Sequence, residues 1–289
     1  MEPNPYKYIN PFTDYGFKRI FGEEPNKDLL IDFLNSVLFD ELGQITDLKY
    51  LCTKFTGYTY SDPRSVLDIL CENEKGEKFI VELQKTKFKF FKEKALYFTN
   101  LPIWMQAQKN DWNFELKAVF VIALLDFIFD ENKKDTENFR YDVKFNHIQT
   151  IEIFQDKVTI IYFEMPKFNK QLEELANNYE KWLYVLKNLG KLEKLPENLR
   201  TEIFVKLFEV ADIDKFTAKQ LSFYEESLNK DRDIKNSLDT AREEGYKKGV
   251  EEGKKIVIAI NALKKGLSIN QIQELTGLSF QEIENLNEK

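Results

Sequence analysis

The spacing of apolar residues changes several times along the first part of the chain. Between residues 26 and 38, apolar side chains recur three and four positions apart, which predicts a helix. Residues 45–60 are rich in β-branched and aromatic types and predict a strand, and residues 67–84 predict two more strands around a charged turn. Helical spacing returns from 88 to about 110, with Pro102 as the expected kink or restart.

Two further strands are expected before residue 168. Residues 116–127, LKAVFVIALLDF, form a continuous apolar run of the kind found in a strand buried on both faces. A charged loop at 130–140 follows, and residues 157–165 alternate weakly as another strand. The order of a helix, three strands, a helix and further strands predicts an α/β fold for residues 1–168.

The remainder of the chain is predicted to be helical. Apolar spacing and polar joints divide it into helices at 171–189, 197–210 and 217–228, with a helical extension at 169–230. A charged tail at 231–289 starts with one long helix and ends with two short ones. Three pairs fit the capping box that opens a helix: Thr217 with Gln220, Ser268 with Gln271, and Ser279 with Glu282.

Composition narrows the possible functions. No apolar run reaches the ~18 residues that a membrane span needs, and the N-terminus lacks the pattern of a secretory signal, so neither a membrane partner nor secretion is expected. The two cysteines, Cys52 and Cys71, favour a reducing cytoplasm over a disulfide scaffold. With His147 as the one histidine, multi-histidine metal sites are excluded. A bound metal would need oxygen ligands, which suit Mg²⁺, Mn²⁺ or Ca²⁺.

Two acids lie in the apolar runs of LDILCENEKGEKFIVELQ, residues 67–84. A three-residue loop ending at Gly76 would put glycine at the left-handed position of the turn. Paired residue numbers then sum to 150, and Asp68 lies opposite Glu82. Two carboxylates at that distance repel unless one is protonated or a cation lies between them. A divalent metal is the economical solution, although acids in hairpins more often face solvent.

A lysine-rich segment follows directly. Residues 85–94, KTKFKFFKEK, interleave five lysines with three phenylalanines. Basic side chains beside an anionic metal site suit a phosphodiester backbone, and the candidate contacts are Lys18, Lys85, Lys87 and Lys89. The alternative for the segment is an exposed helix face. The net charge of −7 argues mildly against a nucleic-acid partner, but a local basic patch can outweigh it.

The spacing of Asp68 and Glu82-Leu83-Gln84 resembles the D…(D/E)xK signature of the PD-(D/E)XK nucleases. NPFTDYGFKRIFG at 10–22, the helix carrying Tyr97 and Gln108, the strand at 116–127 and the tail resemble the PD-(D/E)XK family transposases, also called recombination-promoting nucleases. The resemblance covers nearly the whole chain. It implies a restriction-endonuclease-like core, with a mixed sheet flanked by helices, followed by an all-helical C-terminal region.

By this resemblance, Asp68, Glu82 and the carbonyl of Leu83 bind a catalytic Mg²⁺. Asp14 matches the acid of the opening motif and completes the site, or else caps a helix that begins near Tyr15. Gln84 departs from the superfamily signature, because glutamine hydrogen-bonds a water but carries no charge. Either Lys18 or Lys85 supplies the missing cation, or catalysis is weak.

The tail leaves two features open. Gly245, Gly249 and Gly253 recur every four residues, as a smooth stripe for helix contact in a homodimer or as a flexible linker. The last two helices resemble a helix-turn-helix, but the second is acidic where a major-groove reader is usually basic. A dimerisation or regulatory role is therefore favoured.

Two functions follow from these observations. The first is a metal-dependent DNA endonuclease used in recombination, transposition or defence. The alternative is a catalytically weak or inactive nuclease-fold module that acts in DNA binding or protein assembly.

Overall fold

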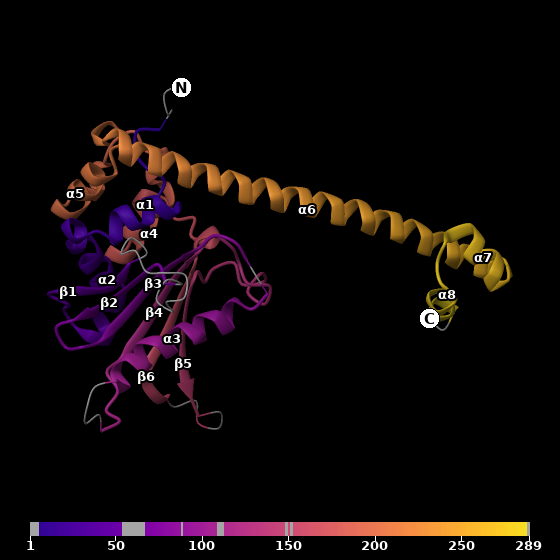
Figure 1. Cartoon of the computed structure of the whole chain (residues 1–289), viewed down its shortest axis with the longest axis horizontal. Helices are drawn as coiled ribbons and strands as arrows, with labels where there is room; N and C mark the ends of the chain where they lie inside the picture. Colours follow the sequence, from indigo (N-terminus) through magenta and orange to yellow (C-terminus); the bar gives the residue numbers. More distant parts are fainter. Residues whose placement is uncertain are drawn as a thin grey trace. The chain divides into compact units, whose positions relative to one another are not determined.

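Six strands form one mixed sheet in the order β1-β2-β3-β4-β6-β5 (Figure 1). The computed structural model describes residues 6–53, 67–87, 89–108, 113–147, 150 and 153–287. The strands are β1 (Leu48–Thr53), β2 (Ile69–Asn73), β3 (Lys78–Gln84), β4 (Val119–Leu125), β5 (Arg140–Asn146) and β6 (Ile153–Glu164). β1, β2 and β3 form an antiparallel meander, β4 is parallel to β3 and β6, and β5 is antiparallel to β6.

The helices lie on the two faces of this sheet. α3 (Phe91–Ala107) covers one face, where its Phe91, Ala95 and Phe98 pack against residues of β2, β3, β4 and β6. α1 (Asp14–Phe21), α2 (Lys27–Leu42), α4 (Asn178–Asn188) and α5 (Glu202–Ala211) pack together on the other side (Figure 1). The Tyr50 hydroxyl of β1 donates a hydrogen bond to the Phe21 carbonyl of α1 at 2.6 Å, which ties the sheet to this group.

Short 3-10 turns connect several elements, at Glu24–Asn26, Met165–Lys167, Leu172–Glu174, Leu189–Lys191, Glu197–Leu199 and Ile213–Lys215. Two of them shorten the predicted helices at 171–189 and 197–210. Asn177 accepts a hydrogen bond from the Glu180 N–H and starts α4 there, and Thr201 does the same for the Phe204 N–H at the start of α5. The side-chain caps therefore fix both starts later than apolar spacing alone indicated.

The pattern-based assignments agree with most of the sheet. β4 is buried at all seven positions, as its apolar run indicated. The prediction missed β5, which is an edge strand with Arg140 and Asp142 paired on its surface. Edge strands commonly carry charges, and these gave the segment the appearance of a loop. α3 runs through Pro102 without a restart.

The chain divides into two compact units, residues 1–227 and 228–289. α4 and α5 belong to the first unit, together with the sheet. α6 is one helix from Ala218 to Lys264, so the break expected between 228 and 231 is absent in this described segment. In the part of the chain that the structure describes, no helix is both long enough and apolar enough to cross a membrane.

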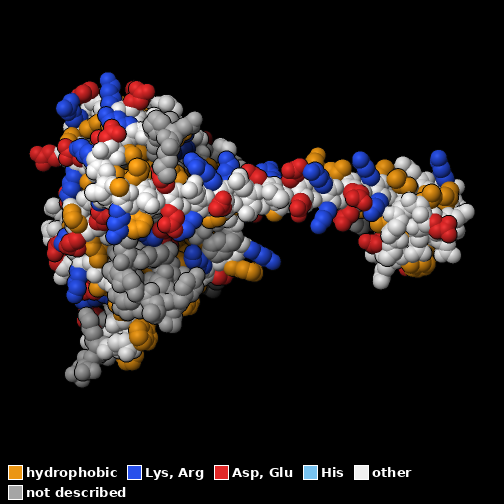
Figure 2. All heavy atoms as spheres, turned by 45° about the horizontal axis from the view of Figure 1, so that its top comes forward, with side chains coloured by type: hydrophobic (Ala, Val, Ile, Leu, Met, Phe, Trp, Pro, Cys, Tyr) orange, Lys and Arg blue, Asp and Glu red, His pale blue; other side chains and the backbone are white. Residues whose placement is uncertain are grey.

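The second unit has a small core of its own. Ala259 and Ala262 of α6 are buried against Ile272 of α7 (Ile269–Thr276) and Ile283 of α8 (Phe280–Asn287). The capping boxes predicted at Ser268 and Ser279 are both formed. On the face drawn in Figure 2, acidic and basic side chains are interspersed along α6. The stripe from Gly245 to Gly253 is helical, and its role in a homodimer or as a linker stays a prediction.

Candidate active site

The hairpin of β2 and β3 has the register that the sequence predicted. Ile69 pairs with Val81 and Leu70 with Ile80, so paired numbers sum to 150. Gly76 has a φ of 81° and its N–H donates to the Asn73 carbonyl at 3.0 Å, which closes the turn. Glycine adopts this left-handed conformation without the strain that a Cβ brings. The turn thereby sets Asp68, just before β2, beside the end of β3.

Asp68 and Glu82 are held together through each other's main chain. The Asp68 N–H donates to Glu82 Oε1 at 2.8 Å, and the Leu83 N–H donates to Asp68 Oδ2 at 3.1 Å. The residues are 6% and 3% exposed, respectively. Burial and reciprocal bonding fix both carboxylates in orientation, as a metal-binding or reactive pair requires. They lie on the sheet face that α3 covers, because Leu70 and Ile80 share their alternation.

Gln84 continues the same row of side chains and contacts a lysine. Its Nε2 donates to the Thr86 carbonyl at 2.9 Å, and Lys94 Nζ donates to its Oε1 at 3.2 Å. Lys94 lies in the first turn of α3, with its ammonium 4.9 Å from the centre of the Phe98 ring. The cation beside Gln84 in this structure is therefore Lys94, which the sequence had placed only within a general basic segment.

Asp14 and Lys18 lie together on α1. Thr13 is the N-cap of this helix, accepting from the Gly16 N–H, so the alternative that made Asp14 the cap is wrong. Asp14 is ion-paired with Lys18, whose side chain is almost fully buried. Asp14 and Lys18 of the opening motif thus form a local ion pair. In the described contacts, Asp14 does not hydrogen-bond to Asp68 or Glu82.

The other three candidate lysines follow β3. Lys87 pairs with Asp130 at 2.5 Å, in the loop after β4. Hydrogen bonds from Lys133 and then Lys87 lower the pKa of Asp130 to about 2. Lys89 is exposed, with its ammonium 5.3 Å from the centre of the Phe90 ring, and Lys85 is half-buried. The segment supplies positive charge near the site, part of it already neutralised by the loop.

The donor set at Asp68 and Glu82 fits a hard divalent cation. Carboxylate oxygens are the ligands that Mg²⁺ prefers, and it commonly takes one or two of them and completes its shell with water and substrate phosphate. Among the described residues, no group of three or more His, Cys, Asp or Glu is placed to hold a metal. The Leu83 N–H points to the Asp68 side, and in an extended strand the carbonyl of the same residue points the same way. The Leu83 carbonyl is therefore expected on the same side as the Asp68 carboxylate.

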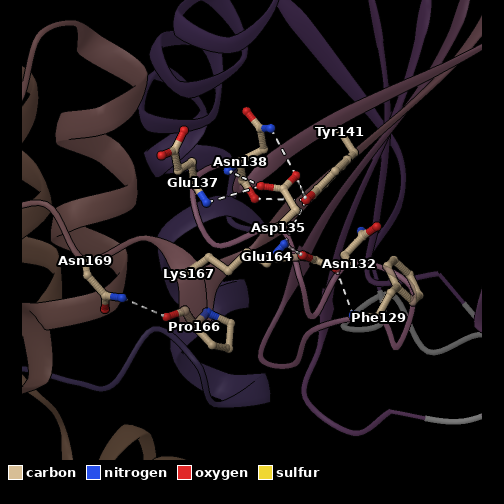
Figure 3. A network of polar contacts seen from close by, with 10 residues as sticks. All are labelled: Phe129, Asn132, Asp135, Glu137, Asn138, Tyr141, Glu164, Pro166, Lys167 and Asn169. Carbon is tan, nitrogen blue, oxygen red and sulfur yellow. Dashed lines mark hydrogen bonds and ion pairs between the residues drawn. The ribbon is translucent and has the colours of Figure 1, made fainter.

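Another buried carboxylate, which the sequence analysis did not single out, lies at the end of β6 (Figure 3). Glu164 Oε1 accepts from the Phe129 N–H at 2.8 Å and from Asn132 Nδ2 at 3.0 Å. Its Oε2 is 2.8 Å from Lys167 Nζ, which also donates to the Tyr141 hydroxyl at 2.7 Å. We call these residues the Glu164 clamp. The clamp fixes the loop after β4 to the sheet, and its charges are matched by each other.

Comparison with known proteins identifies a family. The family model described as PD-(D/E)XK nuclease family transposase matches residues 11–241, which include the sheet, α3 and the Asp68–Glu82 pair. No curated protein and no solved structure gives a significant match to the chain.

Proposed function

The chain belongs to the PD-(D/E)XK nuclease family transposases, and from this premise we propose that it is a metal-dependent endonuclease that hydrolyses phosphodiester bonds in DNA. The observation that carries the proposal is the buried pair of Asp68 and Glu82, each bonded to the main chain beside the other. A fold that needed only stability gains little from two adjacent buried acids. A cation bound between the two carboxylates lowers the electrostatic cost of placing them side by side.

In this proposal Asp68, Glu82 and the Leu83 carbonyl hold Mg²⁺, with Mn²⁺ or Ca²⁺ as possible substitutes. The metal, when bound, supplies Lewis-acid polarisation of the scissile phosphate and lowers the pKa of water. Gln84 orients the attacking water through its amide. The water oxygen forms the new bond to phosphorus, the bond from phosphorus to the leaving oxygen breaks, and that oxygen gains the proton that the water loses.

Lys94 supplies the positive charge that Gln84 lacks. Its contact with Gln84 Oε1 places an ammonium next to the residue that orients the water. An ammonium there stabilises the negative charge that develops on the phosphate oxygens in the transition state. Lys85, Lys87 and Lys89 then bind the flanking DNA backbone in a salt-dependent way. A homodimer formed through the C-terminal helices, and a cytoplasmic site of action, stay predictions.

A plasmid-nicking assay with and without Mg²⁺ tests the proposal. Asp68→Asn keeps the shape of the side chain and an oxygen that accepts from Leu83 but removes the charge. We expect it to lower Mg²⁺-dependent cleavage at least ~100-fold, since several kcal/mol of charge stabilisation is lost. The matched control is Glu74→Gln, an exposed acid at the turn of the same hairpin, and it should keep the wild-type rate.

Three outcomes distinguish the two functions. Cleavage that needs Mg²⁺ and disappears in Asp68→Asn supports the enzyme. A folded wild-type protein that binds DNA without cleaving it identifies the alternative, a nuclease-fold module without catalysis. Cleavage that persists in Asp68→Asn contradicts the assigned site.

A further inference from the structure

The outer face of α3 carries an exposed aromatic stripe. Tyr97 and Trp104 are seven residues apart, so they lie on one side of the helix, and Asn100 and Leu101 lie between them. Tyr97 is 61% exposed and Trp104 is 58% exposed. Large aromatic side chains are usually covered in a folded chain, and a concentrated exposed group marks a binding surface. The core-facing residues of the same helix, such as Phe91 and Ala95, are fully buried and already account for its packing.

This stripe borders a small pocket. Tyr97, Asn100, Leu101 and Trp104 line it together with two residues of the core, Leu67 and Phe98. It encloses about 290 Å³, at the lower end of the ~300–1,000 Å³ typical of ligand sites. The lining is apolar except for the Asn100 amide and the Tyr97 hydroxyl. A planar group with polar edges matches such a lining, because the aromatic rings offer stacking and the amide both donates and accepts hydrogen bonds.

Two residues that line the pocket adjoin residues of the proposed reaction site. Leu67 is bonded directly to Asp68 along the chain. Phe98 carries the Lys94 ammonium over its ring, and Lys94 donates to Gln84. Leu67 is therefore the chain neighbour of one of the two acids, and Phe98 contacts the lysine that bonds to Gln84. A ligand in the pocket is therefore expected close to a phosphate bound at the site.

We propose that this pocket binds one unpaired nucleobase of the DNA strand whose phosphate lies at Asp68 and Glu82. The proposal rests on the proposed function and adds the substrate class: single-stranded DNA, or a duplex with an unpaired nucleotide next to the cleaved bond. The bases of an intact duplex are stacked inside it and reach a side pocket only when extruded. Aromatic stacking binds bases of any sequence, because every base has a π-face.

The size of the surface favours this occupant over a second copy of the chain. A stable dimer interface covers roughly 800 Å² on each partner, whereas this pocket and stripe consist of six residues. Positive charge is also close by, since Lys89, Lys92 and Lys94 stand at or just before the start of the same helix. Stacking residues next to basic ones form the usual combination for single strands.

Fluorescence anisotropy with the full-length chain tests the proposal. The probes are a labelled 20-nucleotide single strand and the same sequence as a blunt duplex, each titrated in Ca²⁺ at fixed ionic strength. We expect wild type to bind the single strand more tightly. Trp104→Ala should weaken single-strand binding about 10-fold and duplex binding less than 2-fold, and Trp104→Phe, which retains a stacking ring, should restore most of the affinity.

Tyr246→Ala is the matched control, because Tyr246 is 72% exposed on α6, far along the chain from the site. It should leave both affinities unchanged. Unchanged single-strand binding in Trp104→Ala, with an unaltered thermal midpoint, overturns the proposal. So does an equal loss for both probes, which indicates a general DNA contact, or a change in molecular mass by light scattering, which indicates a dimer contact.

The same data separate failure of the pocket from failure of the enzyme. A wild-type protein that cleaves DNA but binds single strands equally well without Trp104 retains the proposed function and loses only the pocket. A wild-type protein that binds neither probe and cleaves neither contradicts both.

Discussion

Two places in this molecule bury carboxylates at the ends of strands, and they do so differently. In the Glu164 clamp, a fully buried acid is ion-paired with the buried Lys167 and receives bonds from Phe129 and Asn132. In the hairpin, two buried acids, Asp68 and Glu82, lie next to each other. The Glu82 carboxylate accepts from the Asp68 N–H, and the Asp68 carboxylate accepts from the Leu83 N–H. One arrangement pairs an acid with a lysine. The other places two acids side by side.

We expect this difference to separate structural from functional acids. Burying a charge is unfavourable unless a partner compensates it, and the clamp contains that partner within the fold. Two adjacent acids instead create a site whose electrostatic balance improves when a cation arrives. Burial alone therefore does not identify a reactive carboxylate, but the partner that a carboxylate has does. Three experiments test this distinction, in order of decreasing expected effect.

The largest effect is expected at the clamp. Glu164→Gln leaves the buried Lys167 ammonium without its counter-charge, and we expect a loss of about 3 kcal/mol in the free energy of unfolding. Urea denaturation measures it. Glu197→Gln, at an exposed pair with Arg200, is the control and should change stability by less than ~0.5 kcal/mol. Cleavage per folded molecule should stay at the wild-type level. A stable Glu164→Gln protein without activity would reverse the comparison.

The next effect concerns Lys94 and Lys92 of α3. Lys94→Met should lower Mg²⁺-dependent cleavage about 10-fold, because one charge is lost beside the developing negative charge. Lys94→Arg should recover most of the rate. The matched control is Lys92→Met, two residues earlier on α3 and paired with Glu131. Equal rates for Lys92→Met and Lys94→Met would show that α3 contributes only diffuse charge.

The smallest effect has the opposite sign to the first. Without divalent ions, Asp68→Asn relieves repulsion with Glu82, and we expect a gain in stability of up to ~1 kcal/mol. With Mg²⁺ present, the order should reverse, because only the wild type is stabilised by binding. Thermal midpoints with EDTA and with excess Mg²⁺ measure both states. A variant less stable than wild type in EDTA would place Asp68 with Glu164 as a structural acid.

Much of this architecture could be read from the sequence, where local rules decide it. The hairpin register follows from loop length and the position of Gly76, and it predicted that Asp68 and Glu82 meet. The caps at Ser268 and Ser279 follow from side-chain spacing. The unbroken apolar run of β4 predicts that the strand is buried on both faces. In each case the information lies within a few residues.

The rest depends on contacts between distant segments. Lys94 reaches Gln84 only because α3 packs over the end of β3, which residue spacing does not reveal. Asp14 and Lys18 of the opening motif form an ion pair, since four residues on a helix bring them together, and their part in the site stays a prediction. The Glu164 clamp joins segments about 30 residues apart. β5 was missed because its charged residues suit an edge strand and a loop equally.

The Cys71 thiol reports how often the hairpin opens. It lies in the middle of β2, fully buried, and burial raises the pKa of its thiol well above the ordinary value. A thiol in that state reacts with an alkylating reagent only when the hairpin opens, so its labelling rate in a Cys52→Ser background reports the frequency of opening. Asp68 lies three residues from Cys71, and Glu82 lies three residues from Phe79, the pairing partner of Cys71. We expect an ion that bridges the two acids to slow this labelling. The alkylation rate of Cys71 then measures metal occupancy in the absence of nucleic acid.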